Sequence, residues 1–146
     1  MENSSNARHV RRIVAGNPNT PITVLTRLAE DESSQVRRAV ALNPHTSEEL
    51  LDKLAADDCA EVRLAVVENI NAAKVTLRLL THDENDDVRY SLAECAHVPH
   101  ELLLELSRDE NPYVRFRALK TLNSFVPHLV EDFCSRGSRP VERLYG

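Results

Sequence analysis

Aspartate and arginine recur along this chain at a spacing that could support acid–base chemistry. In four places an aspartate stands six residues before an arginine: Asp31 and Arg37, Asp57 and Arg63, Asp83 and Arg89, and Asp109 and Arg115. Catalysis requires one asymmetric arrangement of side chains, whereas these pairs are copies at equal spacing. A planar guanidinium can bond a carboxylate and a backbone carbonyl together. We therefore interpret the pairs as a structural ladder that ties each turn to the following helix and to the next copy of the motif.

Cys95, His97 and His100 have the spacing C-x-H-x-x-H, which suggests a metal site. Structural zinc sites usually have four ligands, and this cluster offers at most three, without a second cluster elsewhere. Other copies of the motif have ordinary turn residues at these positions. The chain also lacks a Ser/His/Asp or Cys/His set in a cleft-forming segment and a glycine-rich phosphate loop. We predict no metal, no cofactor and no enzymatic activity.

The helices that carry these residues repeat with a strict period. A Val-Arg pair returns every 26 residues, at Val10, Val36, Val62, Val88 and Val114, and a fixed period in this range is typical of a repeat array. Leucines three residues apart predict a first helix in each repeat, at about 21–30, 47–56, 73–81, 99–108 and 125–134. Val-Arg lies on a second helix, at about 8–15, 34–42, 60–68, 86–94 and 112–122. Arg11 has Ser5 in place of the acid, so we expect Arg11 to lack an acidic partner.

The turn that follows each second helix has its own signals. Asn43-Pro44 predicts a helix end, because asparagine tolerates a left-handed conformation and proline cannot continue a helix. Thr46, with Glu49 three residues later, predicts a capping box at the start of the next first helix. Helices this short are unstable alone, so we expect stacking between repeats to supply most of the stability.

The motif D-x4-V-R after a leucine helix resembles the signature of HEAT-like repeats. The 26-residue period and the phrase VRRAVALNPHTSEELLDKLAADDCAEVR are more similar still to the leucine-rich repeat variant family, over about residues 8–122. The resemblance implies an all-α, right-handed solenoid of about five two-helix repeats. Some members of that family hold an iron–sulfur centre in an amino-terminal cysteine cluster, which this chain lacks. We expect a single repeat domain over 1–134, closed by a helix at 125–134 and followed by a flexible tail at 135–146.

The second helices also predict where a partner would bind. At about 100° per residue, the positions two and six residues after each valine lie near 200° and 240°, opposite the apolar side. One row of helices commonly lines the concave binding surface of such arrays. The candidate partner-binding residues are Arg12, Arg38, Leu42, Leu64, Glu68, Tyr90, Glu94, Phe116 and Lys120. Alternatively, the closing helix covers Tyr90 and Phe116, which would then belong to the core.

Composition and charge narrow the class of partner. A formal net charge of -5 disfavours nucleic acid and anionic membranes. We predict non-enzymatic binding of a protein or peptide. Two alternatives stay open: nucleic-acid binding, suggested by Arg12, Arg38 and 15 arginines against 3 lysines, and a role as an accessory or maturation factor for an enzyme, suggested by fold analogy alone. Three unclustered cysteines, with no signal-peptide or membrane-span pattern, predict a cytoplasmic protein.

Overall fold

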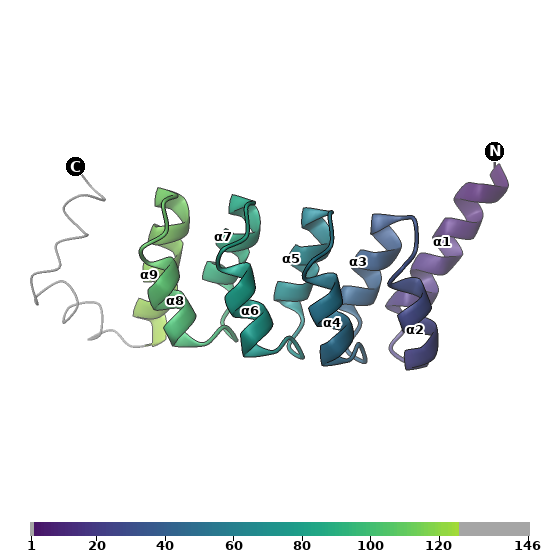
Figure 1. Ribbon diagram of the computed structural model, residues 1–146, viewed down its shortest axis with the longest axis horizontal. Coiled ribbons are helices and arrows are strands. Elements are labelled where there is room, and N and C mark those ends of the chain that lie inside the picture. Colours follow the sequence, from purple (N-terminus) through teal and green to yellow (C-terminus); the bar gives the residue numbers. More distant parts are fainter. Residues whose placement is uncertain (1, 126–146) are drawn as a thin grey trace, which may run out of the picture. The chain divides into compact units, whose positions relative to one another are not determined.

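The fold is all-α, as the sequence predicted. A computed structural model describes residues 2–125, and this part of the chain forms helices without strands (Figure 1). The helices are α1 (Glu2–Gly16), α2 (Ile22–Leu28), α3 (Ser34–Leu42), α4 (Glu48–Leu54), α5 (Ala60–Glu68), α6 (Lys74–Leu80), α7 (Asp86–Glu94), α8 (His100–Leu106) and α9 (Pro112–Phe125). Odd-numbered helices are the second helices of the repeats, and even-numbered helices are the first.

The predicted boundaries hold best in the second helices. α3, α5 and α7 begin and end at the residues that the period predicted. The first helices α2, α4, α6 and α8 have 7 residues each and are shorter than predicted, because their flanking residues form turns. The closing helix at 125–134, apart from Phe125 in α9, and the tail at 135–146 lie outside the described residues.

The chain divides into two compact units, Met1–Thr76 and Leu77–Gly146, and the boundary falls within α6. In unit 1, α3 packs against α1 and α5, while α2 and α4 pack beside them in a second row (Figure 1). In unit 2, α7 and α9 pack together and α8 contacts both. The 26-residue register continues through the boundary, and a single repeat domain over 1–134 stays a prediction.

Aliphatic side chains form the core of each unit. Val36, Val62, Val88 and Val114 of the Val-Arg column are at most 1% exposed, and the leucines of the first helices that face them are buried. Burying a leucine or valine side chain contributes about 1.5–3 kcal/mol. Val10 is the exception at 57% exposed, because no helix of the described chain packs on that side of α1. The short helices therefore owe their stability to their neighbours.

The predicted left-handed residue at the end of α3 is wrong. Asn43 is extended, with φ -69 and ψ 127, and Asn69, which precedes isoleucine and not proline, is extended as well, with φ -81 and ψ 121. The Asn43 side chain bridges two repeats instead: Asn43 Nδ2 donates to the carbonyl oxygens of Ala15 at 2.7 Å and of Asn17 at 2.8 Å. The buried asparagine therefore ties the end of α3 to the end of α1.

The same bridge recurs one repeat later. Asn69 Nδ2 donates to the carbonyl oxygens of Ala41 at 2.7 Å and of Asn43 at 3.0 Å. Asn43 and Asn69 are 1% and 5% exposed, so both amides bond backbone groups away from water. We name Asn43 and Asn69 the asparagine ladder of unit 1. In unit 2 the column has Thr121, whose hydroxyl donates to the carbonyl oxygen of Ala93 at 2.6 Å.

The predicted capping box does not form, because the N-cap lies one residue after Thr46 and is followed three residues later by a leucine. Ser47 is the N-cap of α4, and its hydroxyl accepts from the N–H of Leu50 at 3.4 Å. Thr46 is 1% exposed, and its hydroxyl donates to the carbonyl oxygen of Val40 at 2.6 Å. Thr46 therefore satisfies a carbonyl of the preceding helix end, where four such groups have no partner within the helix.

Candidate protein-interaction face

The arginines of the ladder bond two separate parts of the chain. Arg37 Nε and Nη2 donate to the Asp57 carboxylate at 2.7 and 3.0 Å, and Arg37 Nη1 donates to the carbonyl oxygen of Asp31 at 2.8 Å. The carboxylate partner thus comes 20 residues after the arginine. The aspartate six residues before contributes its backbone carbonyl. The Arg37 guanidinium therefore joins its own turn to the turn of the next repeat.

The same bonds recur in the other repeats. Arg89 in unit 2 donates to the Asp109 carboxylate at 2.8 Å and to the carbonyl oxygen of Asp83 at 2.6 Å. Arg63 donates to the carbonyl oxygen of Asp57, and Arg115 to that of Asp109, both at 2.7 Å. Each ladder aspartate also accepts from the N–H two residues later, in Ser33, Cys59, Asn85 and Asn111. The ladder thus fixes the turn before each second helix.

The expectation that Arg11 lacks an acidic partner is wrong. Arg11 Nε lies 2.6 Å from Asp31 Oδ2, and Arg11 Nη2 lies 3.4 Å from Glu32 Oε1. The serine at position 5 has no consequence for Arg11, because the carboxylate partner of Arg11 is Asp31, which comes 20 residues after it. Arg11 therefore belongs to the ladder together with Arg37.

The ladder lowers the pKa of Asp31 and of Asp57. Burial raises the pKa of Asp57, but the hydrogen bonds with Arg37, with the N–H of Cys59 and with Asp58, together with the charge of Arg37, outweigh it, so the pKa lies below the ordinary value of 3.8. For Asp31, burial likewise raises the pKa, and Arg11 with the N–H of Ser33 overcomes this and lowers it. Both carboxylates are therefore charged in the folded protein at neutral pH.

These shifts predict that acid weakens the fold. A carboxylate whose folded pKa is depressed contributes stability above its unfolded pKa, and this stability is lost as the pH falls through the folded pKa. We expect the urea midpoint of the wild type to fall as the pH is lowered from about 6 to about 3. The Asp57→Asn variant, measured by circular dichroism, should start lower and show a shallower fall.

Asp58→Asn is the matched control, because the Asp58 side chain is 92% exposed although it lies 3.0 Å from Arg37 Nη2. Exposed ion pairs contribute little to stability, so this variant should retain most of the pH dependence of the wild type, although Asp58 also helps to lower the pKa of Asp57. An Asp57→Asn variant with the same slope as the wild type would show that Asp57 is not the titrating group.

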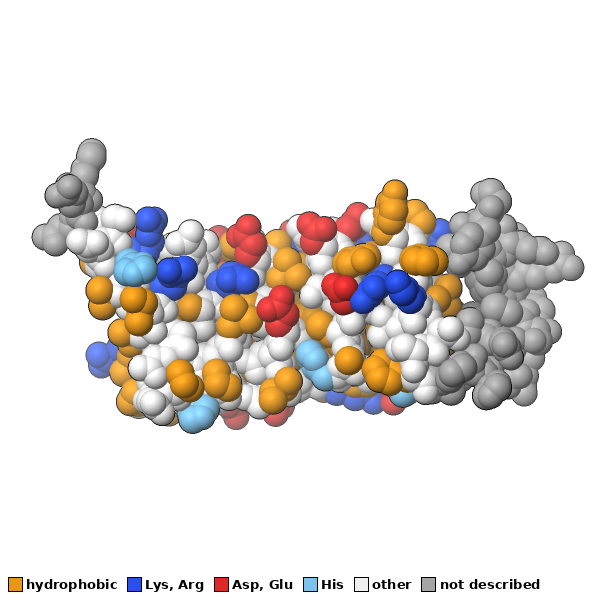
Figure 2. Space-filling model, turned by 180° about the vertical axis from the view of Figure 1, so that it is seen from behind, with side chains coloured by type: hydrophobic (Ala, Val, Ile, Leu, Met, Phe, Trp, Pro, Cys, Tyr) orange, Lys and Arg blue, Asp and Glu red, His pale blue; other side chains and the backbone are white. Residues whose placement is uncertain are grey.

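The candidate partner-binding residues lie on the surface of the second helices. In unit 1, Arg12, Arg38, Leu42 and Glu68 are exposed and Leu64 is half-buried; in unit 2, Tyr90, Glu94, Phe116 and Lys120 are exposed. Figure 2 shows this face of each unit: on unit 1 basic side chains gather toward α1 and α3, and on unit 2 apolar side chains lie beside basic ones. That these residues bind a partner stays a prediction.

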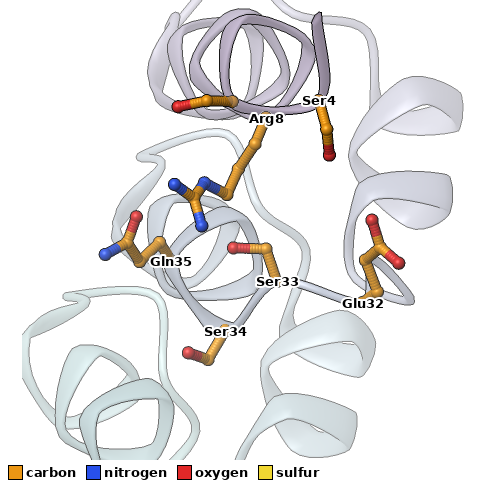
Figure 3. Close-up of a pocket in the computed structure, with 7 residues that line it drawn as sticks. Ser4, Arg8, Glu32, Ser33, Ser34 and Gln35 are labelled. Carbon is orange, nitrogen blue, oxygen red and sulfur yellow. The ribbon is translucent and has the colours of Figure 1, made fainter. Parts of the chain in front are cut away.

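Two hollows open on this face in unit 1. One, of ≈ 390 Å³, is lined by Arg12, Ser34, Gln35, Arg38 and Glu61. The other, of ≈ 690 Å³, is lined by Ser4, Ser5, Arg8, Glu32, Ser33, Ser34 and Gln35 (Figure 3). Both hollows are lined by Ser34 and Gln35, so they are adjacent at the start of α3, and we call the two together the groove of unit 1.

The sequence interpretation missed the position directly before each valine. At 100° per residue this position lies at about 260°, only about 20° from the position six residues after the valine. It places Gln35 and Glu61 in the groove of unit 1 and Tyr113, 76% exposed, on α9 in unit 2. Extending the same angular argument by one residue would have found them.

In unit 2 the exposed apolar side chains lie beside an ion pair. Tyr90 is 37% and Phe116 is 52% exposed. Arg117 Nη2 lies 2.8 Å from Glu94 Oε1, and a small hollow of ≈ 190 Å³ is lined by Glu94, Ala96, Arg117, Lys120, Thr121, Ser124 and Phe125. The segment proposed to cover Tyr90 and Phe116, beyond Phe125, lies outside the described residues, so this alternative stays open.

The C-x-H-x-x-H segment does not gather its side chains. His100 packs against Phe125 with the ring centroids 5.4 Å apart. Among the residues that the structure describes, no group of three or more His, Cys, Asp or Glu side chains is placed to hold a metal ion. Within the same residues, none of the helices has the length and apolar character needed to cross a membrane.

Two family comparisons agree with the repeat motif. Residues 11–69 match the family described as Leucine Rich Repeat Variant domain, and residues 101–129 match the HEAT repeat. No curated protein and no solved structure matches the chain. Helical repeat domains of these kinds are commonly interaction scaffolds. The resemblance seen in the sequence is therefore confirmed over these two segments, and it agrees with the all-α repeat fold that the structure describes.

Proposed function

We propose that this chain is a non-enzymatic scaffold that binds a protein or peptide on the exposed face of its second helices. The observation that carries the proposal is the difference in side-chain exposure between positions on one helix. On α9, Val114 and Ala118 are 1% and 0% exposed, whereas Phe116 between them is 52% exposed. A large aromatic side chain left at the surface is a usual anchor of protein interfaces. The face therefore has the composition of a binding surface.

Two further observations support this surface. Unit 2 has four exposed aromatic side chains on its second helices, Tyr90, Tyr113, Phe116 and Phe125, in a chain that has only six Phe and Tyr residues. The ladder arginines and aspartates are occupied by hydrogen bonds within the repeats, so they offer little for chemistry. Specificity would then reside in the variable positions beside the ladder.

The test removes two of these aromatic side chains. Tyr90→Ala combined with Phe116→Ala is expected to lower recovery of specific partners by at least about tenfold, since truncating an interface anchor commonly costs 2 kcal/mol or more. Recovery on the immobilised protein is measured by quantitative mass spectrometry. Far-ultraviolet circular dichroism verifies that the variant remains folded.

The matched control is Val75→Ala with Leu79→Ala on α6, a first helix. These side chains are 74% and 70% exposed, so the control removes apolar surface from outside the proposed face. Its partner recovery should equal that of the wild type. If both double variants recover the same partners as the wild type, the proposed face does not bind them.

A further inference from the structure

Three arginines of unit 1 surround the groove described above. Arg8 and Arg12 lie one turn apart on α1, and Arg38 lies on α3 at the position equivalent to Arg12. Figure 3 shows Arg8 extending from α1 toward the start of α3, near Ser33 and Gln35. We name Arg8, Arg12 and Arg38, with Ser34 and Gln35 between them, the arginine groove.

The guanidiniums of the arginine groove differ from those of the ladder. Arg11 and Arg37, their neighbours in sequence, each bond a carboxylate with two nitrogens. Within the described residues, Arg8, Arg12 and Arg38 are exposed and have no carboxylate partner, and Arg12 contacts only His9 Nδ1 at 3.5 Å. A guanidinium with unoccupied donors fits a carboxylate in a two-pronged hydrogen bond. The groove therefore offers sites for acidic side chains.

The geometry of the repeat sets the spacing of those acidic side chains. Arg12 and Arg38 stand on α1 and α3, which pack against each other, and packed helices lie about 8–10 Å apart. An extended peptide in the polyproline II conformation has three residues per turn and advances about 3.1 Å per residue. Acidic side chains at positions i and i+3 of such a peptide lie on one face about 9 Å apart and would therefore match the two arginines.

The acidic walls of the groove favour a peptide over a nucleic acid. Glu32 lines one hollow and pairs with Arg11 at 3.4 Å, and Glu61 lines the other, where its Oε2 lies 3.0 Å from Cys59 Sγ. A phosphate backbone has a charge at every nucleotide and would bring some of them close to Glu61. A peptide can confine its charge to two positions, and its backbone can bond the Gln35 amide and the Ser34 hydroxyl.

We propose that the arginine groove of unit 1 binds an extended acidic peptide segment with carboxylates three positions apart, one on Arg12 and one on Arg38. This inference rests on the proposed function and specifies the partner for one part of the same face. Charge complementarity carries it: three arginines without a carboxylate partner in the described residues stand together, in a chain whose net charge is -5.

The test measures binding of a fluorescent eight-residue peptide of serine and alanine with Asp at positions 3 and 6, by anisotropy with the full chain at low salt. We expect saturable binding that weakens as salt is raised, because exposed charges are screened. Replacing both Asp by Asn, or making Arg12→Gln with Arg38→Gln, should lower the affinity by about tenfold or more. Moving the second Asp to position 4 should also weaken binding.

Arg38→Gln and Arg27→Gln form a charge-matched pair of single variants, because Arg27 is exposed on α2 outside the groove. Only Arg38→Gln should weaken peptide binding. Equal losses in the two variants, or no binding of the Asp peptide, would overturn the proposal. Tighter binding of an oligothymidylate with the same dependence on Arg12 and Arg38 would overturn it in favour of nucleic acid. The scaffold proposal is tested separately, by the effect of Tyr90→Ala with Phe116→Ala on partner recovery. Failure of the groove proposal would therefore leave the scaffold proposal unaffected.

Discussion

Asn43→Ala is expected to lower the free energy of unfolding by about 2–4 kcal/mol. The substitution removes both hydrogen bonds that the amide donates to the carbonyl oxygens of Ala15 and Asn17, and the acceptor that Oδ1 offers to the N–H of His45 at 2.9 Å. Asn43 is 1% exposed, so water cannot replace the amide without a rearrangement. Buried backbone groups left without a partner each cost about 1–3 kcal/mol. The change is measured by urea unfolding followed by circular dichroism.

Asn17→Ala is the matched control, because Asn17 is the preceding residue of the same column. The side chain of Asn17 is exposed, and its Oδ1 accepts only the local bond from the N–H of Asn19 at 2.9 Å. We expect this substitution to cost about 1 kcal/mol or less. Equal losses for Asn17→Ala and Asn43→Ala would mean that the bridge between repeats contributes nothing beyond the local turn.

Arg37→Ala is expected to destabilise unit 1 by about 2–4 kcal/mol. The side chains of Arg37 and Asp57 are only 15% and 8% exposed. Without the guanidinium, the Asp57 carboxylate stays largely buried and keeps the hydrogen bond from the N–H of Cys59. The hydrogen bond from Arg37 to the carbonyl oxygen of Asp31 is also lost. A double-mutant cycle with Asp57→Ala, measured by urea unfolding, should give a coupling energy above about 1 kcal/mol.

Arg38→Ala, one residue along α3, is the control for loss of an arginine. Arg38 is exposed and outside the ladder, so we expect its removal to change stability by less than about 0.5 kcal/mol. Arg11→Ala should lie between the two, because the Arg11 side chain is 34% exposed but its carboxylate partner Asp31 is only 8% exposed. A coupling energy near zero for Arg37 and Asp57 would show that the ladder does not hold the repeats together.

The Arg11 result illustrates why a periodic sequence hides its own pairing. In a 26-residue repeat, an acid six residues before one arginine is also 20 residues after the previous arginine, since 26 minus 6 is 20. Interior repeats contain both spacings and cannot distinguish them. The first repeat, where Ser5 and Asp31 differ, separates the two pairings, and the structure shows Arg11 bonded to Asp31. The sequence thus identified the residues of the ladder and assigned the wrong partner.

The asparagine ladder could not be predicted for a different reason. The acceptors of Asn43 are backbone carbonyls 26 and 28 residues away. Every residue has a backbone carbonyl oxygen, so the residue types do not indicate which one accepts the hydrogen bond. Asn43 therefore looked like a local helix terminator, whereas in the structure its backbone is extended and its amide bonds the preceding repeat.

The sequence by itself determined the repeat, its helices and the side that each helix buries. These properties are local and periodic, so α3, α5 and α7 follow from the spacing of valine and leucine alone. Tertiary structure decided which carboxylate each arginine bonds, which amide bridges the repeats, and that Arg8, Gln35 and Glu61 share a groove with Arg12 and Arg38. The physical reason is that these contacts join atoms on separate helices, whose relative position arises only when the repeats stack.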